Sequence, residues 1–176
     1  MSEKTFLRIL EALLIIFGVQ FILWPPGEQR RGLTARLQSG RRKDAMAIEV
    51  GLTAEVQEVV TEKLTAHALG NEGVMVYATP FVVCLMENAA QAAMRPHLPP
   101  GAGTVGTMVE MKHLAATPLG LTVRAKATVI ETDGKRCLFQ VDVFDDVEKI
   151  AEGRHERFVV PNLEKFLVRA MAKRKP

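Results

Sequence analysis

Apolar and polar positions in the central part of the chain predict a strand, a short helical turn and then a long helix. Residues 48–61 (IEVGLTAEVQEVVT) carry β-branched side chains in partial alternation, which is typical of a strand. Residues 62–69 suit a helical turn, and the glycine-containing segment 69–77 is expected to be a mobile loop. A helix is predicted from residue 80 to about 95, because apolar side chains cover most of its circumference. Such a helix is expected to be buried on nearly all sides.

Both ends of this helix have clear signals. Thr79 is expected to be the N-cap, since its hydroxyl can accept a hydrogen bond from a free amide of the first turn. Pro80 then occupies the first helical position, where its missing N–H costs nothing. Pro96 and the cluster Pro99-Pro100-Gly101 end the helix.

Four more strands are predicted after the helix, at residues 104–114, 121–131, 137–144 and 150–160. The first is expected to place five side chains on one side: Val105, Thr107, Val109, Met111 and His113. The next two strands alternate in the same way, with inward positions Val123, Ala125, Ala127, Val129, Phe139, Val141 and Val143. Asp133-Gly134-Lys135 predicts a hairpin turn, and residues 162–175 predict a terminal helix.

One buried helix and a set of antiparallel strands define an α+β class. The expected architecture is the hotdog fold, in which a strongly curved sheet wraps one long central helix. A sheet of this kind has an exposed edge, and edges are commonly covered by pairing with a second copy. We therefore expect a homodimer.

The first 45 residues differ from the rest and are expected to be a separate N-terminal extension, followed by the hotdog domain at 46–176. Residues 6–24 are mostly apolar and could just span a bilayer, although Arg8, Glu11 and Gln20 lie within them. Three interpretations stay open: a dispensable or wrongly assigned extension, a membrane anchor, and an amphipathic docking helix. An anchor with this basic flank would keep the main domain in the cytoplasm.

Composition narrows the class of protein. The chain has 176 residues, 48% of them apolar and 24% charged, which is typical of a soluble globular domain. Residues 1–45 hold eight Lys and Arg against four Asp and Glu, whereas residues 46–176 hold fifteen against sixteen. The main domain therefore shows no charge pattern for binding nucleic acid. Cys84 and Cys137 lie far apart, without metal-ligand spacing, so we expect reduced, buried thiols in the cytoplasm, no disulfide and no metal.

Three polar residues in apolar surroundings are the candidate chemistry: Thr79, Glu87 and His113. Each also has an ordinary interpretation. Thr79 could simply cap the helix, and His113 could be a core histidine. Glu87 could belong to a polar stripe with Asn88, Gln91 and Arg95. Together they suit acyl transfer, because a carboxylate and an imidazole can move protons while a hydroxyl attacks or places water. The N-terminus of the helix is expected to polarise the carbonyl.

Three motifs carry a resemblance to a known family. The segments ATPFVVCLME, VGTMVEMKHLAATPLG and GRHER occur in the order and at the spacing of the fluoroacetyl-CoA thioesterase-like branch of hotdog proteins. The similarity runs from about residue 50 to 166. It implies hydrolysis of acyl-CoA with Thr79, Glu87 and His113 as the catalytic set. It also implies that Gly106 and Arg157 lie near the substrate, and that coenzyme A enters only as part of that substrate, with no other cofactor.

One segment departs from the family pattern. The family's namesake selects its fluorinated substrate through an aromatic lid just before the AT motif. Here residues 68–77 contain Gly70 and Gly73 and no aromatic side chain before Tyr77. We therefore expect a general short or medium acyl-CoA as substrate. The alternatives are a hotdog hydratase or dehydratase, and a non-catalytic acyl-CoA sensor.

Overall fold

A computed structural model describes residues 48–174 of the chain. They form five strands, two α-helices and three short 3₁₀ turns. The strands are β1 (Thr53–Val59), β2 (Gly103–His113), β3 (Thr122–Thr132), β4 (Arg136–Phe144) and β5 (Lys149–Val160). The α-helices are α2 (Thr79–Met94) and α3 (Leu163–Met171). The 3₁₀ turns are η1 (Glu62–Leu64), η2 (His67–Leu69) and η3 (Arg95–His97).

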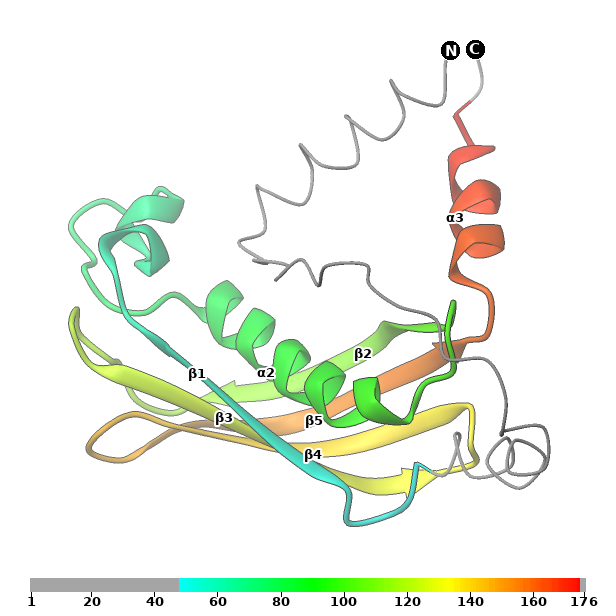
Figure 1. The fold of residues 1–176 in the computed structure, drawn as a ribbon. Helices are drawn as coiled ribbons and strands as arrows, with labels where there is room; N and C mark the ends of the chain where they lie inside the picture. Colours follow the sequence, from blue (N-terminus) through cyan, green and yellow to red (C-terminus); the bar gives the residue numbers. More distant parts are fainter. Residues whose placement is uncertain (1–47, 175–176) are drawn as a thin grey trace, which may run out of the picture. The chain divides into compact units, whose positions relative to one another are not determined.

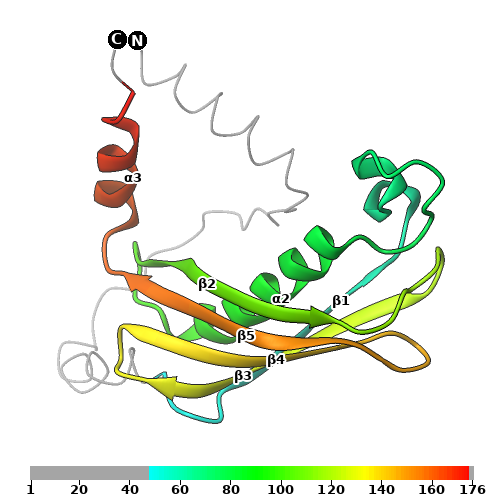
Figure 2. The ribbon, with the colours of Figure 1, turned by 180° about the vertical axis from the view of Figure 1, so that it is seen from behind.

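The strands form one antiparallel sheet in the order β1-β3-β4-β5-β2. Helix α2 lies along one face of this curved sheet (Figure 1), and the opposite face carries none of the described helices (Figure 2). The predicted α+β class and hotdog architecture are thus confirmed. Strands β1 and β2 are the two edges.

The core lies between α2 and the inward side chains of β3 and β4. All seven inward positions predicted for these two strands are fully buried. On α2 the buried residues recur at helical spacing: Val82, Leu85, Met86, Ala89, Ala90, Ala93 and Met94. Small alanines let the helix lie close to the sheet, while the larger residues fill the remaining space. The expected hairpin is confirmed, with Gly134 at φ 85° between β3 and β4.

Helix α2 differs from expectation at its start and along one stripe. Its N-cap is Ala78, in extended conformation, and no side chain caps the helix. Thr79 is the first helical residue, so its predicted capping role is wrong. The outward stripe of α2 is exposed at Pro80, Cys84, Asn88 and Gln91. The expectation of a buried Cys84 thiol is therefore wrong as well, whereas Cys137 is buried as expected.

Strand β2 contains an irregularity that its sequence alternation does not show. Its register against β5 shifts between Gly106 and Met108, so Thr107 is an extra residue in a β-bulge. Before the bulge, Thr104 and Gly106 lie on the face of β2 turned toward the Arg157 and Glu87 side chains, although Gly106 is itself exposed. After the bulge the alternation resumes, with Val109, Met111 and His113 half-buried. The prediction that one face carries residues 105 to 113 is thus wrong at its first two positions.

Helix α3 follows β5 directly. The side chain of Asn162 accepts a hydrogen bond from the Lys165 amide at 2.8 Å and so caps it. Helix α3 has no buried residue, and its apolar side chains are largely exposed: Leu163, Phe166, Leu167, Val168 and Met171.

The predictions for residues 1–45 lie outside the described residues. Among residues 48–174, no helix combines the length and the apolar character that crossing a bilayer requires.

Candidate active site

Thr79 and His113 form a hydrogen-bonded pair at one end of the central helix. Thr79 comes from the first turn of α2 and His113 from the end of β2, and the Thr79 Oγ1 atom lies 2.9 Å from His113 Nδ1. The other ring nitrogen, Nε2, is buried and has no hydrogen-bond partner within residues 48–174. Because buried polar atoms are nearly always paired, this nitrogen indicates a group still to be supplied.

The first turn of α2 offers few free amides beside this pair. Pro80 has no N–H, and the amides of Phe81 and Val82 both donate to the Ala78 carbonyl, at 2.9 and 3.2 Å. These three positions therefore provide no free donor, and the polarisation of a substrate carbonyl by the helix start stays a prediction.

Glu87 lies two turns further along α2, in contact with Arg157 of β5. The Arg157 Nη1 atom is 3.3 Å from Glu87 Oε2, and the Arg157 side chain is only 5% exposed while that of Glu87 is 41% exposed. Thr104 holds the other side of the guanidinium, with its hydroxyl 3.0 Å from Nε and its carbonyl 3.2 Å from Nη2. Burial lowers the pKa of Arg157, and the neighbouring Glu87 carboxylate opposes that shift. Arginine stays charged in proteins, so Arg157 is a fixed cation beside the acid.

Gly106 makes room for the Glu87 carboxylate. A Cβ atom at this position would lie 3.2 Å from both carboxylate oxygens and 3.0 Å from the Cε1 atom of His155. A larger residue here would require the Glu87 and His155 side chains to shift by a few tenths of an ångström, so glycine suits this close approach of β2 to the acid. Gly106 and Arg157, both predicted near the substrate, thus lie together against Glu87.

The predicted catalytic residues do not all meet within one chain. Thr79 and His113 are in contact, but Glu87 is eight residues further along α2, which corresponds to about 12 Å along a helix axis. The structure contains two groups: the Thr79–His113 pair, and the Glu87–Arg157 ion pair beside Gly106.

Sequence reasoning missed His155, which belongs to the second group. This residue is fully buried and its Nε2 atom is 3.1 Å from Arg157 Nη1. The charged residues that flank it on the strand favour a solvated position and conceal its role. The alternation of β5 was the usable signal, since residues 155 and 157 must share one face.

Tyr77 does not act as a lid. It is 1% exposed, and its hydroxyl lies between the Phe81 carbonyl, at 3.0 Å, and the Glu58 carboxylate. Burial raises the pKa of Tyr77, and the hydrogen bond to Glu58 raises it further. The exposed apolar side chains of the preceding segment are aliphatic: Leu69, Val74 and Met75.

The two groups of the site are not arranged as metal ligands. Within residues 48–174, no group of three or more His, Cys, Asp or Glu side chains could hold a metal ion.

The fold and these two groups define a hotdog-fold protein with a hydroxyl, an imidazole and a carboxylate along its central helix. The structure of the fluoroacetyl-CoA thioesterase FlK is 38% identical and has a TM-score of 0.68, covering 73% of this chain and 98% of that chain. The sequence profile of the family described as fluoroacetyl-CoA-specific thioesterase matches residues 60–163, and the chain belongs to this family. The resemblance inferred from the motifs is thereby confirmed.

Two further relatives agree with this assignment. The fluoroacetyl-CoA thioesterase of Streptantibioticus cattleyicolor is 47% identical over 91 residues, which are 52% of this chain and 65% of that protein. The chain thus spans slightly less than two thirds of that relative. A thioesterase superfamily member from Thermus thermophilus is 31% identical, with a TM-score of 0.64 over 72% of this chain and 95% of that chain.

Proposed function

We propose that the protein is an acyl-CoA thioesterase that hydrolyses a short or medium acyl-CoA to the free acid and coenzyme A. Membership of the family supports the reaction class. The observation that carries the proposal is the 2.9 Å contact between the Thr79 hydroxyl and His113, which leaves the hydroxyl unused for capping. Cys84 and Cys137 are free thiols, which supports a cytoplasmic location.

The proposed chemistry needs only side chains and water. His113 Nδ1 accepts a proton from the nucleophile, and the released thiolate is a good leaving group that needs no strong acid. Two nucleophiles fit this geometry: the Thr79 hydroxyl itself and a water molecule that it holds. The first forms an acyl ester on Thr79, which water then hydrolyses to the free acid and the restored hydroxyl; in the second, water attacks the thioester directly. Mass spectrometry of protein quenched during turnover separates them, because only the first adds the acyl mass to the chain.

For His113 to act as a base through Nδ1, its Nε2 atom must carry the hydrogen and donate it to an acceptor. Glu87 is the acceptor that we propose, supplied by a second copy of the chain. Because Nε2 is buried within one chain, this contact requires the side chains around His113 to move when the dimer forms. Strand β2 is an edge of the sheet, and a two-fold antiparallel pair of β2 strands sets the start of one opposite the end of the other. Gly106, beside Glu87, is near the start, and His113 is the last residue. Such a homodimer brings Glu87 of one copy toward Thr79 and His113 of the other.

The test is a screen of purified protein against acyl-CoAs of graded length, with detection of the free thiol. We expect turnover that Thr79→Ala and His113→Ala each reduce by at least about a hundredfold. The matched control is Thr61→Ala, which removes an exposed threonine hydroxyl from the turn before η1. Conversion of an enoyl-CoA without thiol release would indicate a hydratase instead. Tight binding of every acyl-CoA without turnover would indicate a sensor.

A further inference from the structure

His155 is a buried imidazole that the proposed reaction does not use. It lies on the inner face of β5, two positions before Arg157, and its side chain is fully buried. A polar ring at such a position costs free energy unless its nitrogens are paired. Both are paired here, and the partners restrict what the ring can be.

The two partners determine the protonation state of the ring. His155 Nδ1 lies 2.9 Å from the Met108 carbonyl oxygen, which only accepts, so Nδ1 carries the hydrogen. His155 Nε2 lies 3.1 Å from Arg157 Nη1, which only donates, so Nε2 is bare. Burial lowers the pKa of His155, the Met108 bond opposes this shift, and the Arg157 charge adds to it. The donor at Nδ1, the acceptor at Nε2 and the lowered pKa all indicate a neutral ring.

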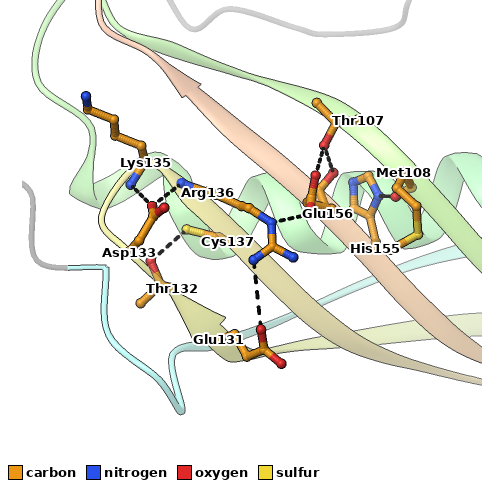
Figure 3. A network of polar contacts seen from close by, with 10 residues as sticks. All are labelled: Thr107, Met108, Glu131, Thr132, Asp133, Lys135, Arg136, Cys137, His155 and Glu156. Atoms are coloured by element: carbon orange, nitrogen blue, oxygen red, sulfur yellow. Dashed lines mark hydrogen bonds and ion pairs between the residues drawn. The ribbon is translucent and has the colours of Figure 1, made fainter.

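The Met108 carbonyl is available to His155 because of the bulge in β2. The extra residue, Thr107, donates its hydroxyl to Glu156 Oε1 at 2.6 Å, and Arg136 forms an ion pair with the same carboxylate. Figure 3 shows the Thr107 side chain directed at Glu156 and the His155 ring directed at Met108. Contacts on the outer face of the sheet thus hold the bulge whose carbonyl sets the His155 tautomer.

We propose that His155 is a positioning residue: fixed as the neutral Nδ1–H tautomer, it accepts a hydrogen bond from Arg157 and thereby directs that guanidinium at the Glu87 carboxylate. The charged groups that face the ring are Arg157 and Glu156 of its own strand and Glu87 of α2. A second proton on the ring would set two cations against each other and turn the guanidinium away from Glu87. The inference rests on the proposed function, because it matters for turnover only if Glu87 takes part in hydrolysis.

Two substitutions separate the two ring nitrogens. His155→Gln places its amide oxygen close to the position of Nε2, so Arg157 keeps an acceptor while the bond to Met108 is lost. His155→Asn reaches only the position of Nδ1, so the bond to Met108 is kept while Arg157 loses its acceptor. Both variants lose the imidazole and its packing, which makes each the control for the other.

We expect the Asn variant to lose kcat by on the order of a hundredfold with little change in KM, because a misdirected carboxylate affects turnover more than binding. The Gln variant should stay within about tenfold of the wild-type kcat. Phe139→Leu, in the β4 position that pairs with residue 155, is a control for destabilisation alone. It should melt at a lower temperature and keep its kcat. Equal kcat in the folded Asn and Gln variants would overturn the proposal.

Two NMR measurements test the proposal independently of catalysis, and the first of them needs only the wild-type protein. In the wild-type protein, long-range ¹H–¹⁵N spectra should show a protonated Nδ1 and a bare Nε2 for His155 at neutral pH. A hydrogen on Nε2 would overturn the proposal. The Arg157 guanidinium protons should exchange slowly in the wild type and in the Gln variant, and rapidly in the Asn variant. If no acyl-CoA is hydrolysed, the proposed function fails, and these spectra still decide the role of His155.

Discussion

Two residues of this site have hydrogen-bond or ion-pair partners that differ from what their local sequence pattern predicts. Thr79 precedes a proline at a helix start, a pattern that predicts a cap, yet its hydroxyl is bonded to His113. Glu87 shares a helix with exposed Asn88 and Gln91, a pattern that predicts a solvated stripe, yet it faces a buried guanidinium. In both cases the partner comes from a strand more than thirty positions away in the chain. Local patterns cannot supply that information.

Glu87→Gln is the first prediction at this scale. Glutamine keeps the shape of the side chain but removes the charge and the proton acceptor, so kcat should fall by at least about a hundredfold. The buried Arg157 then has no counter-charge, so the free energy of unfolding should fall. The fall should be only about 1 kcal/mol, because residue 87 is partly exposed and solvent screens the lost interaction. Steady-state kinetics and urea unfolding measure the two effects. The control is Gln91→Glu, which adds a carboxylate on the exposed stripe and should change neither kcat nor the free energy of unfolding by much. A Glu87→Gln protein with more than a third of the wild-type kcat would refute the role of Glu87.

Gly106→Ala tests the close approach of β2 to the acid. The added methyl would lie 3.2 Å from the Glu87 oxygens and 3.0 Å from His155, so the carboxylate must move. We expect kcat to fall by roughly tenfold, since a displacement of about 1 Å costs about a hundredfold in well-ordered sites and the carboxylate moves by less than that. Gly103→Ala is the matched control, because its methyl meets only the Leu163 side chain, which can rotate. Similar losses in both variants would show that the strand, and not the site, is sensitive.

At the scale of elements, alternation predicted β3 and β4 correctly and failed in β2. The inner faces of β3 and β4 are continuous rows of Val, Ala and Phe, and no other register would bury them. In β2, Thr107 suits either face, so nothing in the sequence indicates that it is an extra residue. The bulge follows from the pairing with β5, which is not visible in a single strand. For the same reason, the Glu87–Arg157 contact could not be derived from the sequence: it requires β5 to lie between β4 and β2.

The turn between β4 and β5 should make stability depend on pH. Asp145 is buried, and burial alone would raise its pKa, but the Glu148 and Val147 amides and the Thr117 hydroxyl hold the pKa below its usual value. A carboxyl group with a depressed pKa stabilises the fold above its unfolded pKa of about 3.9, and this contribution disappears as pH falls through the folded pKa. Asp145→Asn should therefore be less stable at pH 7, by about 1–3 kcal/mol. Urea unfolding should show the stability difference between the two proteins shrinking as pH falls below the unfolded pKa of about 3.9. Parallel curves of unfolding free energy against pH for the two proteins would contradict this prediction. Glu148→Gln is the control, because it removes a neighbouring carboxylate and leaves Asp145 and its hydrogen bonds in place.

The segment before α2 should decide substrate selectivity. Its exposed apolar side chains are aliphatic, and the one aromatic residue, Tyr77, is buried. We expect kcat/KM for fluoroacetyl-CoA to exceed that for acetyl-CoA by no more than about tenfold. This ratio corresponds to a difference of about 1.4 kcal/mol in activation free energy. Competition between the two substrates measures the ratio directly. A ratio of a thousand would show that another element discriminates fluorine.

At the scale of the whole molecule, the proposed dimer makes each site from two chains. Thr79→Ala and Glu87→Gln damage different halves of the site. A mixed dimer therefore contains one intact site and one site with both changes. After random exchange of subunits, half of the dimers are mixed, and activity should recover to about a quarter of the wild-type value.

Before the subunits are mixed, light scattering of each protein should show a mass near twice that of the monomer. The control mixes Thr79→Ala with His113→Ala, which damage the same half and should not complement each other. Failure of the first pair to recover activity would place the whole site in one chain.

The position of β5 has a consequence for the order in which the protein folds. Within the described sheet, β2 has no neighbour except β5, although it precedes β5 in the chain by two other strands. Strands β1, β3 and β4 can pair once residue 144 has left the ribosome. Strand β2 must wait for Lys149–Val160, which close a long loop and carry both His155 and Arg157. During synthesis, helix α2 with Glu87 is therefore complete before Arg157, the counter-ion of Glu87, has been added. A chain that ends before β5 can form most of the core, but it lacks the Arg157 guanidinium that pairs with the Glu87 carboxylate.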